Sequence, residues 1–429
     1  MSRTRFLSLL FLLPGVLAAA PAAAPPTVLR CGSLIDGVAD SPRAGATVVI
    51  EGNRIAAVGG SGEPAAPGAR VIDLGDATCL PGLIDAHAHI LIKTQDYQVD
   101  HLRRSSAYKA LRGLAVAQEM LRAGWTTIRI VGDADVHYAH LDLRTAFEEG
   151  LFHGPRITGA GHYLSITGGG GDINFLAPEH RVAADGLVVD GIDAVRRAVR
   201  QEVKYGSDWI KVLASGAMMS SGDNPDSAHF SPEELRALVD EATRLGAPVA
   251  AHAHSAEGIR QAVRAGVRSI EHGTFLDQEG IELMAEHGTW LVPTLFIMEP
   301  GIINNEPTDK DLELAERLRT FRAERFARLR AAFEAGVKIG VGTDYVGFPV
   351  VDGAREFALL AEAGLTPMQA IRAGTQVNAE LLGWGDRIGT IEPGKLADLI
   401  AVDGNPLDDL GALQRVTFVM LDGSVIRRD

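Results

Sequence analysis

The feature that most constrains the fold of this chain is a regular alternation of strand-like and helix-like segments between residues 81 and 383. Short apolar runs alternate with longer segments of helical periodicity. The strand candidates are 83–90, 126–131, 155–160, 208–213, 248–253, 267–272, 289–294 and 337–343. The helix candidates are 105–123, 191–205, 232–245, 256–265 and 310–335. Strands that alternate with helices in this way predict a closed (β/α)8 TIM barrel of the α/β class over residues 81–383.

Two helix starts support this alternation. Ser231 is followed by Pro232 and Glu234, a capping box with proline at the first helical position. Residues 366–369 repeat the device. A doubly wound open sheet is the alternative, but no glycine-rich opening of the dinucleotide-binding type is found in the sequence.

Both ends of the chain are typical of β structure instead. Short strand candidates at 47–50, 54–58 and 69–73 are matched by candidates at 397–402 and 416–420. Asp422 and Gly423 predict a tight hairpin near the C-terminus. We therefore expect residues 27–80 and 384–429 to form one small β-sandwich domain beside the barrel.

The first twenty residues indicate export. Arg3 and Arg5 precede an apolar run from Phe6 to Leu17, and three alanines follow. A basic start, a short apolar stretch and small residues are the marks of a secretory signal peptide. We expect residues 1–20 to be removed and the mature protein to be periplasmic or secreted, without membrane attachment. A retained anchor is the alternative, although the run is short for a membrane span.

The two cysteines, Cys31 and Cys79, both lie in strand candidates of the N-terminal region. An oxidising compartment would allow them to form a disulfide. Two buried thiols that behave as small hydrophobic side chains are the other reading. We expect the buried thiols and leave the disulfide open.

Charge restricts the partners of the chain. Its formal net charge is −14, with 41 basic and 55 acidic residues. Binding along a nucleic acid requires clustered Lys and Arg, so we exclude such a partner. A small molecule is the expected partner, and assembly into a homo-oligomer stays open.

Potential metal ligands follow the ends of the predicted barrel strands, where the chemistry of such barrels is found. His87 and His89 are two residues apart at the end of the first strand, so their side chains point to one side. The fifth strand ends in His252 and His254, the sixth in His272 and the eighth in Asp344. Imidazoles and a carboxylate that converge in this way predict a divalent metal site.

Lys211 lies inside the apolar fourth strand. An inward ammonium beside divalent cations would be opposed by repulsion and by desolvation. Reaction with carbon dioxide would turn this lysine into an anionic carbamate that can bridge two ions. The alternative is an ammonium paired with Asp208 or another carboxylate, and the strand pattern alone does not decide between them.

These motifs resemble the amidohydrolase superfamily, in particular its metal-dependent Xaa-Pro dipeptidases and carboxypeptidase-like amidases, which include ochratoxin-hydrolysing amidases. The resemblance covers nearly the whole mature chain. Its marks are Pro81–His89, Trp209–Lys211, Ala251–His254, Ile270–Gly273, Gly342–Asp344, Ala373–Thr375 and Gly389–Leu399.

The resemblance implies a binuclear centre, with zinc as the default metal and manganese or cobalt as substitutes. Its ligands would be His87, His89, Lys211, His252, His272 and Asp344, with carboxylated Lys211 bridging the two ions. A hydroxide that bridges the ions would attack an amide carbonyl, and Asp344 would act as the general base. The expected substrates are dipeptides such as Xaa-Pro or N-acyl amino acids such as ochratoxin-like aryl amides, with a free carboxylate.

Substrate contacts are expected from two places. The segment 161–172, with four consecutive glycines, corresponds to a pocket-lining region in relatives and contains His162 and Ser165. His254 stands where relatives often carry tyrosine, so we interpret it as a substrate contact.

Two other functions stay open at this point. One is a mononuclear cyclic amidohydrolase such as an imidazolonepropionase, against which Lys211 argues. The other is a non-catalytic binding protein on the same fold, which would be expected to have lost ligands.

Overall fold

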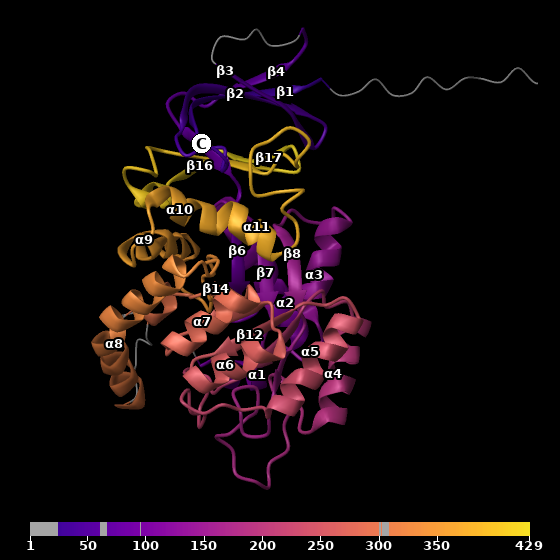
Figure 1. Cartoon of the computed structure of the whole chain (residues 1–429). Helices are drawn as coiled ribbons and strands as arrows, with labels where there is room; N and C mark the ends of the chain where they lie inside the picture. The colour runs from indigo at the N-terminus through magenta and orange to yellow at the C-terminus, as the bar shows by residue number, and fades with distance from the viewer. Residues whose placement is uncertain (1–24, 61–66, 95, 300–301, 303–308) are drawn as a thin grey trace, which may run out of the picture.

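The described residues of the computed structural model, 25–60, 67–94, 96–299, 302 and 309–429, form a helix-covered barrel and a sheet beside it (Figure 1). The predicted signal peptide lies outside this range. None of the helices in the described part is long and apolar enough to span a bilayer.

The barrel is built from parallel strands in chain order. They are β6 (Leu83–Ala88), β7 (Trp125–Val131), β8 (Arg156–Ala160), β9 (Tyr163–Ser165), β11 (Ile210–Leu213), β12 (Val249–Ala253), β13 (Ser269–His272) and β14 (Trp290–Val292), with the short β10 (Leu187–Val188) beside β9. The third barrel position is divided, because β8 pairs with β7 whereas β9 pairs with β11. Backbone amides of Asp208 and Trp209 donate to Gly159 at 2.8 and 3.1 Å and join the two halves.

The eighth position differs from the expectation of a regular strand over 337–343. This segment makes one isolated bridge, Leu291 to Ile339, and a second one, Ala88 to Tyr345, lies just after it. It still closes the barrel, because the Ala86 amide donates to the Val341 carbonyl at 2.9 Å. The reason lies in close packing: a Cβ on Gly342 would stand 2.6 Å from the Cβ of His87. Glycines inside a strand weaken it, so the ladder stays irregular here.

Helices cover the barrel. They are α1 (Tyr97–Arg103), α2 (Ser106–Arg122), α3 (Ala139–Glu148), α4 (Ile192–Lys204), α5 (Pro232–Arg244), α6 (Ala256–Ala265), α7 (Gln278–His287), α8 (Asp309–Glu334), α9 (Arg355–Glu362), α10 (Pro367–Arg372) and α11 (Asn378–Leu381), with short turns η1 (Phe296–Met298), η2 (Val350–Ala354), η3 (Ala373–Val377) and η4 (Leu410–Gln414). Both predicted capping boxes are present, at Ser231 before α5 and at Thr366 before α10.

The two chain ends meet in one sheet. Its strands are β1 (Thr27–Leu34), β2 (Arg43–Glu51), β3 (Arg54–Gly60), β4 (Arg70–Asp73), β5 (Thr78–Pro81), β15 (Leu399–Val402), β16 (Val416–Leu421) and β17 (Ser424–Arg428), in the order β17-β16-β15-β5-β1-β2-β3 with β4 beside β1. The predicted hairpin joins β16 to β17, with Asp422 and Gly423 at φ angles of 52° and 74°. The sheet has an apolar core of its own, separate from that of the barrel.

A disulfide joins Cys31 on β1 to Cys79 on β5, and this corrects the expectation of two buried thiols. The two strands pair in parallel at Ser33–Thr78 and Leu34–Cys79, which brings the two cysteine Cα atoms to 5.9 Å. That separation suits a disulfide. The sequence could not supply it, because strand pairing over 48 residues is a tertiary property.

The sheet fixes which end of the barrel faces solvent. Pro81 ends β5 and Leu83 starts β6, so the N-terminal ends of the barrel strands lie against the sheet (Figure 1). Arg156 at the start of β8 reaches across this junction to Asp398 at 2.9 Å and to Asp422 at 2.8 Å. The C-terminal strand ends therefore lie on the side away from the sheet.

Candidate metal centre

The structure brings together four histidines and an aspartate that the sequence singled out as ligands. His87 is on β6 and His89 follows it, while His252 and His272 lie on the neighbouring β12 and β13. The Oδ1 atom of Asp344 is 3.2 Å from Nε2 of His89 and 3.5 Å from Nε2 of His87. Five potential donors thus converge from four places in the barrel wall.

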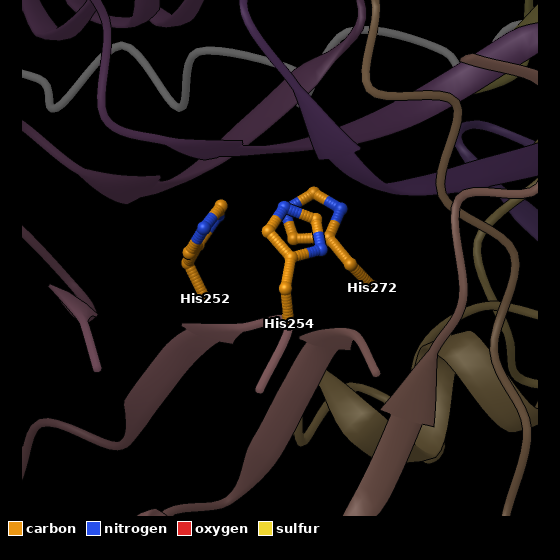
Figure 2. A group of neighbouring side chains, drawn as sticks. All are labelled: His252, His254 and His272. Atoms are coloured by element: carbon orange, nitrogen blue, oxygen red, sulfur yellow. The ribbon is translucent and has the colours of Figure 1, made fainter. Parts of the chain in front are cut away.

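Two groups of side chains have donor atoms close enough for one ion each. In the first, atoms of His87, His272 and Asp344 lie within 4.8 Å of one another. In the second, His252, His254 and His272 do so, and Figure 2 shows their three rings gathered above the ends of two adjacent strands. His272 belongs to both groups, so the two positions are adjacent.

Hydrogen bonds orient these imidazole rings. Nδ1 of His87 lies 2.8 Å from Oε2 of Glu271, and Nδ1 of His272 lies 2.7 Å from the hydroxyl of Thr294. Nδ1 of His254 is bonded in the same way to Thr274 at 2.7 Å. A second partner on one ring nitrogen fixes the tautomer and leaves the other nitrogen for a metal. All three rings therefore have the support that metal-binding histidines need.

Burial keeps these histidines neutral. It lowers the pKa of His87 to about 4, although Asp344 and Glu271 act in the opposite direction. Burial also places the pKa values of His252 and His272 well below the ordinary range, and neighbouring histidines add to the effect. A metal ion binds the unprotonated imidazole, so His87, His252 and His272 are in the binding form at neutral pH. His89 differs, because burial lowers its pKa but the hydrogen bond and the charge of Asp344 outweigh burial and raise it.

Lys211 on β11 is 2% exposed and lies at the same end of the barrel. In the described part of the chain, no carboxylate lies within 4.0 Å of its Nζ atom. Asp208, the partner suggested by the alternative reading, pairs instead with Arg144 at 2.6 Å. Burial lowers the pKa of Lys211 to about 8, and Arg129 adds to the effect against attraction from Glu271 and Asp344. A lysine with a lowered pKa is more often the neutral amine, the form that reacts with carbon dioxide.

The sequence reasoning missed a buried ion pair behind the ligands. Arg129 on β7 donates to Oε1 of Glu271 at 2.8 Å, and both side chains are fully buried. Burial would raise the pKa of Glu271, but Arg129 and His87 hold it below its usual range. The signal was available: an arginine in an apolar strand and a glutamate directly before His272.

Backbone conformation is unusual at this end of the barrel. His272, Thr294 and Asp344 have φ angles of 71°, 43° and 51°, values that residues other than glycine seldom adopt. His272 and Asp344 are predicted ligands, and the hydroxyl of Thr294 is hydrogen-bonded to Nδ1 of His272. Uncommon backbone conformations of this kind are often found at functional sites, where the surrounding structure holds the residues in place.

The structure does not bring His162 and Ser165 into either group. His162 is 2% exposed, and its Nδ1 atom lies 2.8 Å from Glu202 on α4. The Ser165 hydroxyl accepts from the Gly171 amide at 3.1 Å, so it shapes the glycine-rich segment. Their predicted contact with a substrate stays a prediction.

The glycine-rich segment is held in place by its neighbours. The Gly170 carbonyl accepts from Ser220 at 2.9 Å and from Gln98 at 3.2 Å. A Cβ on Gly169 would stand 2.6 Å from the Ser165 hydroxyl, and one on Gly170 would stand 2.8 Å from Ala217. These glycines therefore allow the glycine-rich segment to pack closely against the segments that contain Gln98 and Ser220, over the strand ends.

Comparison with known proteins gives consistent results. The model of the amidohydrolase family matches residues 78–426. An ochratoxinase of Aspergillus niger is 33% identical over 427 residues, which cover 94% of this chain and 86% of that protein.

The similarity to solved structures extends over nearly the whole chain as well. A Xaa-Pro dipeptidase with methionine bound in its active site is 36% identical, with a TM-score of 0.85, and the match covers 93% of this chain and 99% of that chain. A prolidase in complex with N-methylphosphonate-L-proline is 34% identical, with a TM-score of 0.84, over 94% of this chain and 100% of that chain.

Proposed function

This chain belongs to the amidohydrolase family and is a hydrolase of amide bonds, and from this premise we propose that it cleaves dipeptides or N-acyl amino acids with two divalent ions. The observation that carries the proposal is the pair of adjacent donor groups that share His272. The similarity to a Xaa-Pro dipeptidase, a prolidase and an ochratoxinase supports a small amide or peptide substrate.

The donor set fits divalent ions such as zinc. Neutral imidazoles with oriented rings and one carboxylate are the ligands that zinc prefers, and manganese or cobalt could replace it. One ion would be held by His87 and Asp344 together with His89, whose Nε2 atom lies 3.2 Å from Asp344, and the other by His252 and His272. A carbamate on Lys211 would lie between them, and the unpaired, deeply buried amine supports this role.

When bound, such ions supply Lewis acidity that activates water and polarises a carbonyl. The chain would supply the proton transfers. Asp344 is the one carboxylate in the two donor groups, and it contacts His87 and His89 at 3.5 and 3.2 Å. We assign Asp344 as the base that takes a proton from the attacking water and gives it to the leaving amine.

We also propose that His254 faces the reacting carbonyl. Its Nδ1 atom is occupied by Thr274, so Nε2 is the nitrogen directed to the group with His252 and His272. A neutral imidazole donor at this position could stabilise negative charge on the carbonyl oxygen. Burial lowers its pKa to about 3, so it would act uncharged.

The test is hydrolysis by protein stripped of metal with a chelator and then reloaded with zinc. The substrates are Xaa-Pro and Xaa-Arg dipeptides and N-aroyl-phenylalanine, with amino-acid release as the measurement. We expect release only from reloaded protein that binds two ions per chain. One ion per chain would favour the imidazolonepropionase-like alternative, and binding without release of any product would favour a non-catalytic protein.

Export is a second part of the proposal. The disulfide between Cys31 and Cys79 is typical of proteins in oxidising compartments, which supports a signal peptide at residues 1–20. Expression in a bacterium that has a periplasm tests it: the mature N-terminus should lie near residue 20 and the protein should appear in the periplasmic fraction. Retention in the cytoplasm at full length would contradict it.

A further inference from the structure

The ring of His272 is held by a residue with an uncommon backbone conformation. His272 belongs to both donor groups, so its orientation matters for both ions. Its Nδ1 atom lies 2.7 Å from the hydroxyl of Thr294, which is in the loop after β14. Thr294 is fully buried and has a φ angle of 43°, a value that a β-branched residue rarely adopts. The ligand therefore depends on how this loop is held.

The loop needs support from outside the barrel sheet. A residue in a rare φ region keeps its conformation only when its surroundings hold the neighbouring peptide units. Before Thr294, the chain is still in the sheet, where Val292 is paired with Glu271. After Thr294, the chain has left the sheet and turns into η1. On this side the support has to come from another element.

Glu356, near the start of α9, supplies this support. Its two carboxyl oxygens accept from two consecutive backbone amides, that of Leu295 at 3.0 Å and that of Phe296 at 2.5 Å. The Leu295 amide belongs to the peptide unit that follows Thr294, so this hydrogen bond restricts the ψ angle of Thr294. The second bond holds the next peptide unit. One side chain thus fixes the loop directly after the residue that orients His272.

The surroundings of Glu356 indicate that it is more than a packing residue. Its side chain is fully buried, and among the described residues no nitrogen of Lys, Arg or His lies within 4.0 Å of its carboxyl group. A buried carboxyl group without a cationic partner costs folding free energy. The guanidinium of the preceding Arg355 lies 4.8 Å over the ring of Phe296, so α9 contacts the loop at a second point.

From this arrangement we propose that Glu356 is a positioning residue for the metal centre and acts on His272 through Thr294. It does not touch an ion itself; it fixes the orientation of the imidazole that both ions would share. The inference rests on the proposed binuclear centre and adds a residue that sets its metal affinity. Removing a partner that orients a metal-binding histidine typically lowers metal affinity by about 10- to 100-fold.

The test measures zinc affinity against a competing chelator, together with the visible spectrum of the cobalt-loaded protein, which reports the geometry of the ligands. Glu356→Leu removes both acceptor oxygens and should weaken zinc binding by about 30-fold and change the cobalt spectrum. Glu356→Gln keeps one acceptor oxygen and should weaken zinc binding by about fivefold. The milder variant keeps the test informative if the leucine variant does not fold.

Asp398→Asn is the matched control at the sheet end. Asp398 is also a buried carboxylate that holds a backbone amide, because it accepts from Asp422 at 2.7 Å. Its substitution should lower the free energy of unfolding in urea. It should leave zinc affinity and the cobalt spectrum unchanged, because its partners lie at the other end of the barrel.

A double substitution identifies the route of the effect. Thr294→Val keeps the shape of the side chain but removes the hydroxyl that is bonded to His272. If Glu356 acts through Thr294, adding Glu356→Gln to Thr294→Val should weaken zinc binding by less than about twofold. Losses that multiply in full would show that Glu356 acts by another route and would overturn the inference.

The outcomes separate the two proposals. If the wild-type protein binds zinc but hydrolyses none of the amides, the proposed function fails, and the role of Glu356 is still measured by metal affinity. If both Glu356 variants are less stable in urea but keep the wild-type zinc affinity and cobalt spectrum, only the positioning role is overturned, because Glu356 then does no more than pack the loop.

Discussion

The two ends of the barrel bury charged and polar side chains in opposite ways. At the end against the sheet, Arg156 is paired with both Asp398 and Asp422, at 2.9 and 2.8 Å. At the far end, Lys211 is buried without a carboxylate within 4.0 Å in the described part of the chain, beside histidines whose pKa values burial has lowered. The same barrel thus pairs Arg156 with carboxylates at one end and leaves Lys211 without a nearby carboxylate at the other.

This difference indicates that the sheet end contributes to stability, whereas the far end serves the proposed binding of metal. A buried group without a partner costs folding free energy, so a fold retains it only where something else compensates. At the far end a bound divalent ion would supply that compensation to the imidazole nitrogens, and to Lys211 only in its anionic carbamate form. The sheet end, with its pairs and its disulfide, holds the scaffold without a ligand. Substitutions at the two ends should therefore change different quantities.

The largest effect is expected from Asp344→Asn at the ligand end. The amide keeps the shape of the side chain but cannot take a proton, so kcat should fall by about 10³-fold. Bound zinc should stay above half of the wild-type level in elemental analysis. Asp226→Asn, the same change on an exposed residue at this end, is the control. Near-native turnover of Asp344→Asn would refute its role as the base.

At the sheet end, the double substitution Cys31→Ser, Cys79→Ser should act on stability alone. The bridge closes a loop of 48 residues, and the chain-entropy estimate for a loop of that length is about 4 kcal/mol. Urea unfolding should show this loss, while kcat of the zinc-loaded protein at 25 °C stays within twofold. A parallel loss of kcat would mean that the two ends are coupled.

Acid should destabilise the metal-free protein through the ligand end. The pKa of His87 is about 4 in the folded state, against an ordinary value of 6.5. Between these values the unfolded chain binds the proton first, so this stability is present above pH 6.5 and is lost as the pH falls towards 4. The shift corresponds to about 3 kcal/mol. Urea unfolding with a chelator at several pH values should show the slope, and His87→Asn should reduce it.

The smallest effect is expected from removing the buried amine. Lys211→Met should raise the unfolding free energy of the metal-free protein by about 2 kcal/mol, since an unpaired buried charge is replaced by an apolar side chain. Zinc affinity should fall at the same time. Arg156→Met at the sheet end should do the reverse and destabilise by about 1 kcal/mol, because it breaks existing pairs. Lower stability of metal-free Lys211→Met would contradict the comparison.

Particular residues show how much of the fold and of the candidate site could be predicted from the sequence. The alternation of strands and helices predicted the barrel, and the period-two spacing of His87 and His89 helped to predict the strand ends where the candidate ligands lie. The same reasoning could not pair Thr294 with His272 or Arg129 with Glu271, because the partners are 22 and 142 residues apart in the chain, although Arg129 inside an apolar strand was a signal that could have been noticed. It could not show that Glu202 on a neighbouring helix occupies one ring nitrogen of His162, whose contact with a substrate stays a prediction.

Local periodicity, capping residues and turn chemistry depend on neighbours in the chain, so the elements, the α/β class and the list of potential ligands were determined by the sequence itself. Pairings over long separations depend on how those elements pack. Tertiary structure alone therefore decided the Cys31–Cys79 disulfide, the unpaired state of Lys211 and the sharing of His272 between two donor groups.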